Sequence, residues 1–451
     1  MKEIMGTGVA LCTPFNVDGT IDFGSLEKLV ESCIQGGVEY LVALGTTAET
    51  ATLSDQDKQA VVNSIVQTNA GRLPIVLGIG GNNTELVAKQ INQSAYKDFA
   101  AILSVAPYYN KPNQEGFYRH YSYLAENTEA NIIMYNVPGR TGSNMLPATT
   151  LRLAEKHPSL VAIKDAPLDF TQFLELLGNK PKDFLVLSGD DMWALSSVIA
   201  GAAGTISVIG QGLPQQFSDM IRLGLKGNAK EAFALQYQLM PFIDLIFKEG
   251  NPAGIKGLLK VQGTIKEKGV RLPLSEISET LEKELQTAFQ NLSALNKQIK
   301  LESESSNLYL SMASWAESNG FEGTAMFLYQ HADEERMHML KLVKFLNERG
   351  GKVIIPGTSE PKNDFETVQD LFETLLEHEL GVSEQINGLV GLTLSEKDHI
   401  TNNFLQWFVT EQIEEEKLAR TILDKLKLIG DAKSGMYLFD QDIKNMHKAV
   451  E

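Results

Sequence analysis

The sequence predicts two folds in one chain: a (β/α)₈ (TIM) barrel, followed by an all-α four-helix bundle. At 451 residues the chain is too long for one ordinary hydrophobic core, so two or three domains are expected. Up to about residue 210, eight apolar runs alternate with helical stretches. Beyond about residue 290, apolar residues recur with helical periodicity only.

The eight apolar runs are continuous, as expected for parallel strands that are buried on both faces. They begin at residues 6, 40, 73, 100, 131, 160, 184 and 204. About eight strand–helix units in roughly 200 residues favour a closed barrel. A doubly wound open sheet is the alternative, although no G-x-G-x-x-G opens the first helix. Residues 213 to about 290 are expected to be helical only.

The second part of the chain predicts long helices at about 294–319, 323–350, 365–391 and 395–427, with a short fifth helix near 437–448. A long connection, GGKVIIPGTSEPKND, separates the second helix from the third and can cross the bundle from end to end, which is typical of a ferritin-like bundle. No Pro- or Gly-rich linker precedes these helices. We therefore expect the boundary inside a long helix or at a kink near Leu292–Asn296, with domains at 1–292 and 293–451.

Charge and cysteine content exclude several classes of partner. The formal net charge of −17 argues against nucleic acid and anionic membranes. No apolar run is long enough to span a bilayer, and no signal peptide follows Met1. Cys12 and Cys33 are the only cysteines, so a disulfide framework is not expected and a reducing cytoplasm fits.

Polar residues gather where the expected barrel strands end, and such residues share one mouth at the C-terminal face of a barrel. They are Thr46, Thr47, Tyr109, Tyr135, Arg140, Lys164, Gly189 and Asp190.

Lys164 is the most informative of these residues. Partial desolvation at the end of an apolar strand disfavours the ammonium form and frees an amine to attack a carbonyl, which predicts a Schiff base. An ion pair with Asp165 is an equal alternative for Lys164 considered alone. Tyr135 can move protons at such a site, and Arg140 offers a planar fork for a carboxylate.

Residues 1 to about 290 resemble the dihydrodipicolinate synthase family of class I aldolases. The resemblance rests on GTTAET, YYNKPNQEG, YNVPGRTG and IKDA, in this order. It implies that pyruvate condenses on Lys164, that the enamine attacks aspartate semialdehyde in lysine biosynthesis, and that no organic cofactor takes part. It also implies a proton relay of Tyr135, Thr47 and Tyr109, the last entering a neighbouring subunit's site.

Further roles follow from the same resemblance. Arg140 would hold the aldehyde's carboxylate, and Thr46, Gly189 and Ile206 would line the pyruvate pocket. Arg140 favours this branch over the sialic-acid lyases, which are the alternative. Ala48, Thr50 and Asp165 depart from the family pattern but leave the Lys–Tyr–Thr–Tyr set complete. Leu86, Asp55 and Lys58 stand where lysine-inhibited members carry a glutamate and two histidines, which argues against feedback inhibition by lysine.

The stretch HADEERMHM in the second part predicts a metal site. Glu335 and His338 are i and i+3 on a helix, so they share one face, and a carboxylate with an imidazole suits divalent iron. A solvated charge run is the better reading of a lone E-x-x-H. Further candidates on the other helices shift the balance toward a di-iron bundle site. They are Glu302, Tyr309, Glu379, Gln412 and Glu415.

Residues from about 294 to 451 resemble bacterial non-haem ferritin through SSNLYLSMASWAE, HADEERMHM and FLQWFVTEQIEEEKL. The resemblance implies oxidation of Fe²⁺ by O₂ or peroxide and storage of ferric mineral in a shell of 24 subunits. Its iron ligands carry over to Glu302, Glu335, His338, Glu379, Gln412 and Glu415, with Tyr309 and Trp407 beside them. A third iron site would use Glu334, Glu411 and Glu414.

Together these readings predict a fusion of a lyase and a ferritin. The alternative is a scaffold, natural or engineered, in which one half only displays the other. Family barrels form dimers and tetramers, whereas a ferritin shell has octahedral symmetry, and an off-centre tetramer shares at most one two-fold axis with it. We therefore expect the shell to control assembly, with barrel dimers outside it.

Overall fold

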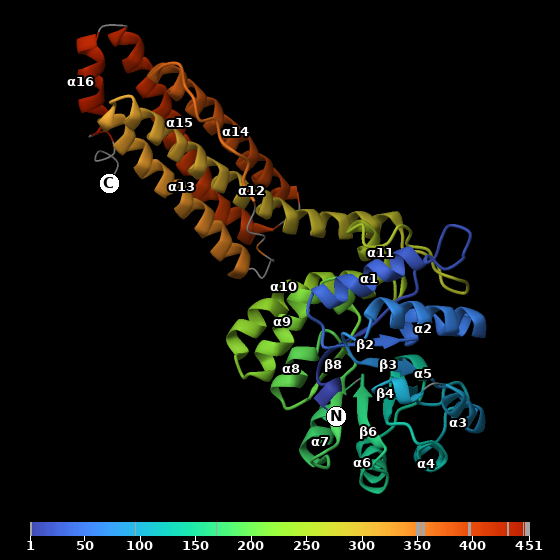
Figure 1. The fold of residues 1–451 in the computed structure, drawn as a ribbon. Coiled ribbons are helices and arrows are strands. Elements are labelled where there is room, and N and C mark those ends of the chain that lie inside the picture. The colour runs from blue at the N-terminus through green and yellow to red at the C-terminus, as the bar shows by residue number, and fades with distance from the viewer. Residues whose placement is uncertain are drawn as a thin grey trace. The chain divides into compact units, whose positions relative to one another are not determined.

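The computed structural model describes residues 2–94, 96–167, 169–348, 353, 357–395, 398–430, 433–444 and 446. The chain divides into two compact units, Met1–Ala288 and Phe289–Glu451. Figure 1 shows the strands and helices α1–α11 in the first unit and long helices in the second. The division falls inside helix α12, Glu279–Ser318, a few residues before the boundary predicted from the sequence.

The first unit is a closed barrel in which each strand pairs in parallel with the next and β8 pairs with β1. This closure confirms the predicted barrel and excludes the open sheet. The strands are β1 Gly6–Ala10, β2 Tyr40–Ala43, β3 Ile75–Gly78, β4 Ala101–Val105, β5 Ile132–Asn136, β6 Leu160–Asp165, β7 Leu185–Ser188 and β8 Gly204–Ser207.

Helices cover the outside of the barrel and complete the first unit (Figure 1). They are α1 Phe23–Gln35, α2 Asp55–Asn69, α3 Thr84–Gln93, α4 Gln114–Asn127, α5 Pro138–Thr141, α6 Pro147–Lys156, α7 Phe170–Asn179, α8 Ala194–Ile199, α9 Pro214–Leu225, α10 Ala229–Lys248 and α11 Ala253–Val261. Capping side chains fix several starts: Ser54 and Asp57 form a reciprocal capping box at the start of α2.

The prediction of helix throughout residues 213–290 is wrong for residues 262–278, which are turns and irregular backbone. Gly263 adopts a φ of +70°, a conformation that ends a helix at low cost only for glycine. Pro273 lacks the backbone N–H that a continuing helix would need. The irregular segment carries Arg271, whose guanidinium donates hydrogen bonds to Gly19 O and to the Asp57 carboxylate.

The second unit is a bundle of long helices, as predicted. The helices are α12 Glu279–Ser318, α13 Glu322–Glu348, α14 Val368–Ser395 and α15 His399–Ile429, with the short α16 Lys433–Ile443 after them. α13 and α14 are joined by residues 349–367, of which 349–352 and 354–356 lie outside the described residues.

The bundle core consists of two separate apolar clusters. One contains Ile299, Leu342, Val382 and Phe408, and the other contains Tyr309, Ala332, Leu375 and Ala419. On each of the four long helices, the fully buried residues between these two clusters are polar. These residues form a polar layer between the two apolar clusters, and the predicted metal ligands lie in this layer.

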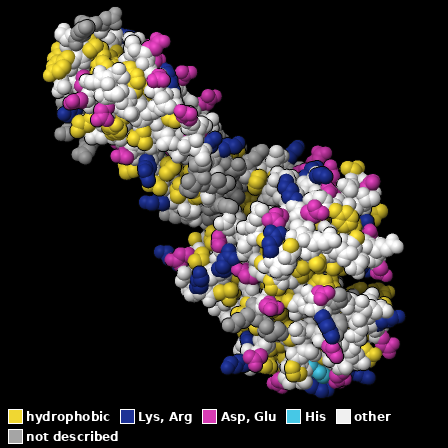
Figure 2. All heavy atoms as spheres, in the orientation of Figure 1, with side chains coloured by type: hydrophobic (Ala, Val, Ile, Leu, Met, Phe, Trp, Pro, Cys, Tyr) yellow, Lys and Arg dark blue, Asp and Glu magenta, His cyan; other side chains and the backbone are white. Residues whose placement is uncertain are grey.

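No helix among the described residues is both long and apolar enough to cross a membrane. Figure 2 shows acidic and basic side chains interspersed over the visible face of each unit.

Candidate functional site

Lys164 and Tyr135 each lie next to the last residue of a barrel strand. Strand register places them side by side, because Tyr135 of β5 pairs with Lys164 of β6. Both side chains are buried, at 5% exposure for Lys164 and 6% for Tyr135. The Lys164 Nζ lies 4.3 Å from the centroid of the Tyr135 ring. The two predicted residues are therefore in contact, and the tyrosine ring shields the amine from water.

Gly189 provides the space in which the Lys164 side chain lies. A Cβ at this position would lie 3.0 Å from Lys164 Cε and 3.2 Å from its Cγ, which is closer than ordinary side-chain contacts. Ile206 is 1% exposed in the barrel's interior apolar cluster.

Asp165 does not pair with Lys164. Its buried carboxylate accepts a hydrogen bond from Asn136 Nδ2 at 2.8 Å, and the Gln172 amide lies 3.5 Å away. Burial raises the pKa of Asp165 to about 6, while these amides oppose the shift. Among the described side chains no ion pair joins Lys164 and Asp165, so the ion-pair alternative is wrong and the amine stays available.

Asn251 joins two other predicted residues and was missed by the sequence reasoning. Its Nδ2 donates to Thr47 Oγ1 at 3.0 Å, and its backbone oxygen accepts from Arg140 Nη2 at 3.2 Å. Thr47 is buried, whereas Arg140 is exposed. Thr46, Tyr135, Arg140 and Asn251 line one cavity. No local signal could identify Asn251, which lies in the turn before α11, far from any strand end.

A buried ion pair between Glu49 and Lys256 supports the loop that carries Thr47. Glu49 has a left-handed backbone conformation, with φ of 57°, two residues after Thr47. Its Oε1 lies 2.5 Å from Lys256 Nζ, and the side chains of this pair are 1% and 0% exposed. Its Oε2 accepts from the backbone N–H of Arg271 at 2.8 Å. This support is also a non-local feature that sequence reasoning missed.

The Tyr109 side chain does not lie in the barrel mouth of its own chain. It is 87% exposed and has a φ of 70°, which lies in the left-handed region. The residue before it, Tyr108, lines the cavity instead. The predicted role of Tyr109 in a neighbouring subunit's site therefore stays a prediction.

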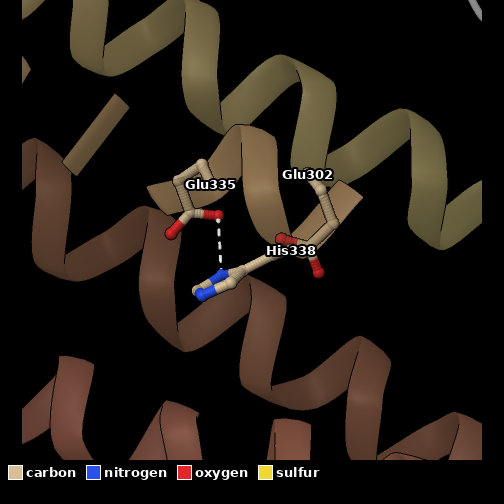
Figure 3. A group of neighbouring side chains, drawn as sticks. All are labelled: Glu302, Glu335 and His338. Carbon is tan, nitrogen blue, oxygen red and sulfur yellow. Dashed lines mark ion pairs between the residues drawn. The ribbon is translucent and has the colours of Figure 1, made fainter. Parts of the chain in front are cut away.

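In the bundle, Glu302 of α12 meets Glu335 and His338 of α13, and all three side chains point toward one another (Figure 3). One ligand atom from each lies within 4.8 Å of the others, and all three residues are buried. His338 Nδ1 lies 3.6 Å from Glu335 Oε2. The predicted helical i, i+3 pair therefore faces the interior, which contradicts the solvated-face reading.

The cluster places two buried acids beside one imidazole. Burial raises the pKa of Glu335 to about 8, and it raises the pKa of Glu302 well above its usual range, with the Glu335 charge adding to the shift. Glu302 Oε2 is buried without a hydrogen-bond partner among the described residues. Gln298, which was not predicted, donates to the other oxygen of Glu302 at 2.8 Å. An orphaned carboxylate oxygen beside a second acid and an imidazole fits a bound cation.

Glu379 of α14 and Gln412 of α15 form the other side of the polar layer. Gln412 Nε2 donates to Glu379 Oε2 at 3.2 Å, and the Tyr309 hydroxyl donates to Glu379 Oε1. Burial raises the pKa of Glu379 well above its usual range, and the nearby Glu415 charge adds to the shift. The six predicted iron ligands, Glu302, Glu335, His338, Glu379, Gln412 and Glu415, are all buried between the two apolar clusters.

The three acids predicted for a third iron site differ in their burial and in their contacts. Glu334 lies 2.7 Å from Nδ1 of His331, a residue that the sequence reasoning did not select. Glu411 is half-buried, and Glu414 is exposed. The metal-capable group that the structure forms here consists of His331, Glu334 and Glu415.

Comparisons with known proteins cover both parts of the chain. Residues 3–292 match the Dihydrodipicolinate synthetase family, and residues 292–429 match the Ferritin-like domain. The chain is 52% identical over 293 residues to the 4-hydroxy-tetrahydrodipicolinate synthase of Flavobacterium psychrophilum, covering 65% of this chain and 100% of that protein. The enzyme of the same name from Azobacteroides pseudotrichonymphae is 48% identical over 281 residues, which cover 62% of this chain and 95% of that protein.

Solved structures give the same result for the barrel. Dihydrodipicolinate synthase from Thermotoga maritima is similar with a TM-score of 0.62 and 35% identity, over 64% of this chain and 98% of that chain. The chloride-inhibited dihydrodipicolinate synthase from Acinetobacter baumannii, complexed with pyruvate, is similar with a TM-score of 0.61 and 37% identity, over 64% of this chain and 98% of that chain.

Proposed function

We propose a specific pair of reactions for this chain, which belongs to the dihydrodipicolinate synthetase family through residues 3–292 and carries a ferritin-like domain at 292–429. The barrel is a lyase that condenses pyruvate with aspartate semialdehyde through an imine on Lys164. The bundle oxidises Fe²⁺ and stores the ferric product. Both reactions belong in the cytoplasm.

The observation that carries the first reaction is the buried Lys164 amine beside Tyr135. Lys164 Nζ attacks the ketone carbon of pyruvate, and the carbonyl oxygen leaves as water when the imine forms. Loss of a proton from the methyl carbon gives an enamine, and this carbon then attacks the aldehyde carbon of the second substrate, whose oxygen takes up a proton to become a hydroxyl. The amine of the second substrate then displaces Lys164 Nζ from the imine carbon, which closes the ring and frees the lysine. Tyr135 and Thr47 supply and accept the protons of these steps, and Tyr109 of a neighbouring subunit completes the relay.

The second substrate is held by Arg140 at the rim of the same cavity. Its guanidinium offers two parallel N–H donors to a carboxylate, and the Asn251 backbone oxygen supports it at 3.2 Å. In the sialic-acid alternative the aldehyde that partners pyruvate is a neutral amino sugar without a carboxylate, so this guanidinium supports aspartate semialdehyde instead. Thr46, Gly189 and Ile206 shape the pyruvate pocket.

Borohydride trapping tests the first reaction. Pyruvate with borohydride should add one reduced pyruvyl group per chain, and peptide mass mapping should place it on Lys164. Lys164→Arg keeps a cation but should abolish trapping, because a guanidinium does not form the imine. An adduct that persists in this variant would contradict the assignment.

The observation that carries the second reaction is the buried Glu302–Glu335–His338 cluster with its orphaned carboxylate oxygen. We assign Fe²⁺, the substrate, to this cluster and to a neighbouring position formed by Glu335, Glu379, Gln412 and Glu415. The assigned ligands provide mostly carboxylate oxygen and one imidazole, that of His338, a set that suits iron. Tyr309 orients Glu379 by its hydrogen bond.

Stopped-flow oxidation of Fe²⁺ tests the second reaction. Glu335→Gln should remove the fast phase, because both positions lose a shared carboxylate. Glu373→Gln, on the exposed face of α14, is a matched control that should leave the phase unchanged. A fast phase that survives Glu335→Gln would contradict the assigned site, and a wild-type chain with no fast phase would return the bundle to a structural role, which is the scaffold alternative.

Assembly is part of this proposal. We expect a shell of 24 chains of 49.7 kDa each, about 1.2 MDa in total, with barrel dimers outside. Barrel dimers can lie on the two-fold axes of the shell, whereas the symmetry of a barrel tetramer cannot be combined with that of the shell in one closed particle. Mass photometry of dilute protein should show this particle. A stable species of four chains with no larger form would refute it.

A further inference from the structure

Ser383 of α14 carries a hydroxyl group that the reactions proposed above do not use. Its Oγ lies 2.9 Å from Gln412 Oε1 and 2.6 Å from Glu416 Oε1, and both of these residues belong to α15. A serine hydroxyl has one proton to donate and lone pairs with which it can accept. Ser383 can therefore donate fully to only one of these two oxygens at a time.

Glu416 is a partner that accepts hydrogen bonds and does not donate them. Its second oxygen, Oε2, lies 2.7 Å from Arg420 Nη2 in an ion pair, and an ionised carboxylate has no proton to give. The contact of Ser383 with Glu416 is also the shorter of its two contacts, as expected for a hydroxyl that donates to a charged acceptor. Glu416 therefore competes with Gln412 for the single Ser383 proton.

Gln412 presents its amide nitrogen to Glu379 in this structure. Nε2 donates to Glu379 Oε2 at 3.2 Å, while Oε1 faces Ser383. An amide NH₂ group donates hydrogen bonds and does not accept them, so it is no ligand for a cation. In this orientation the Gln412 amide also occupies an oxygen of Glu379 that a cation would need.

A half-turn of the Gln412 amide exchanges its two ends and leaves the rest of the side chain in place. Oε1 then faces Glu379 Oε2 across the observed 3.2 Å. Two oxygens at right angles around a cation, each about 2.1 Å from it, are separated by about 3 Å. Nε2 then faces Ser383 Oγ, which can accept this N–H while it donates its own proton to Glu416. The half-turn therefore creates a pair of oxygen ligands and leaves both ends of the amide with a partner.

We propose that Ser383 is a positioning residue that acts through Gln412. With no ion bound, its hydroxyl faces the amide oxygen, and the amide nitrogen stays on Glu379. When Fe²⁺ binds beside Glu379, the amide turns its oxygen to the ion, and Ser383 accepts from the nitrogen and donates to Glu416. This inference rests on the proposed iron chemistry of the bundle. The competing role for Ser383 is a purely structural link between α14 and α15.

The first test uses the full chain, freed of metal, with Co²⁺ as the probe. Anomalous diffraction at the cobalt edge locates the bound ions, and the refined structure gives the distance from the ion beside Glu379 to the end of the Gln412 side chain. We expect about 2.1 Å, which only a bond to the amide oxygen can give. A distance above about 3 Å would mean that the amide does not ligate the ion, and it would overturn the inference.

Equilibrium dialysis measures the affinity for the same ion. Ser383→Ala should weaken Co²⁺ binding beside Glu379 by about tenfold, the factor that corresponds to one lost hydrogen bond, and should leave the ion at the Glu302–Glu335–His338 cluster unchanged. Ser395→Ala is the matched control, because the exposed Ser395 hydroxyl of α14 donates to Leu392 O of its own helix. This control should bind Co²⁺ as the wild type does.

A double variant distinguishes the positioning role from a structural one. A carboxylate has two equivalent oxygens and needs no half-turn, so Ser383→Ala in a Gln412→Glu background should change the Co²⁺ affinity by less than about twofold. A tenfold loss in that background as well, or an unchanged affinity in Ser383→Ala alone, would overturn the inference and leave the proposed function standing. A wild-type chain that binds no Co²⁺ in the polar layer would overturn both.

Discussion

Lys256→Met should destabilise the barrel strongly, because it leaves the buried Glu49 carboxylate without its cationic partner. Lys256 Nζ lies 2.5 Å from Glu49 Oε1, with side-chain exposures of 0% and 1%. It also donates to Gly269 O at 2.8 Å. Methionine has a similar length, so it fills the space but cannot neutralise Glu49.

The magnitude follows from this burial. Removing one partner of a buried ion pair costs about 3–5 kcal/mol. A unit that spans Met1–Ala288 has an unfolding entropy of about 0.6 kcal/mol/K, taking about 2.1 cal/mol/K per residue. The melting temperature of the barrel should therefore fall by about 5–8 °C. Activity should fall as well, since Glu49 holds the loop that carries Thr47.

Scanning calorimetry of the full chain measures this effect. The barrel transition is the one that pyruvate raises, because the ligand binds only the folded barrel. Lys58→Met is the matched control: Lys58 pairs with Asp55 at 3.4 Å on the surface, where the Asp55 side chain is 96% exposed. Such pairs contribute about 0–1 kcal/mol, so its shift should stay below about 2 °C.

A double variant, Lys256→Met with Glu49→Gln, should lose less stability than Lys256→Met alone, because no buried charge is left unpaired. The reasoning would be refuted by a Lys256→Met shift no larger than that of Lys58→Met.

Three further predictions concern the barrel. Arg140→Ala should raise the KM for aspartate semialdehyde by about 10- to 100-fold through loss of a charged hydrogen bond, while pyruvate trapping on Lys164 stays unchanged; equal losses for both substrates would count against the carboxylate role. Asn251→Ala should lower kcat by about tenfold because Thr47 loses its hydrogen bond, and steady-state kinetics with unchanged kcat would show that Thr47 needs no such support. Burial raises the pKa of Asp191 from 3.8 to about 6, so the folded state binds more protons and the free energy of unfolding should fall by about 3 kcal/mol as the pH rises through this window. Asp191→Asn should remove that slope in urea titrations from pH 4 to pH 7, and an identical slope in the variant would reject this source.

The sequence by itself determined the elements and the residues whose roles depend on local position. Continuous apolar runs are typical of strands buried on both faces, so a parallel barrel could be predicted before any contact was known. Lys164 could be selected because its strand end was identifiable, and Glu335 with His338 because helical spacing puts i and i+3 on one face. The connection at 262–278 was predicted as helix, although its two glycines and its proline are residues that interrupt helices.

Only the tertiary structure decided which distant groups complete these sites. Asn251 meets Thr47, and Lys256 meets Glu49, across more than 200 residues of sequence. The partners of Asp165 were also decided in space: it follows Lys164 on β6, so its side chain points to the opposite face of the strand, where Asn136 and Gln172 contact its carboxylate. Ser383 became a candidate positioning residue only when α15 brought Gln412 and Glu416 to its hydroxyl. Periodicity indicates which face of an element is buried. The partner of a buried polar group is set by packing between elements, and a single sequence does not contain the distance between two elements.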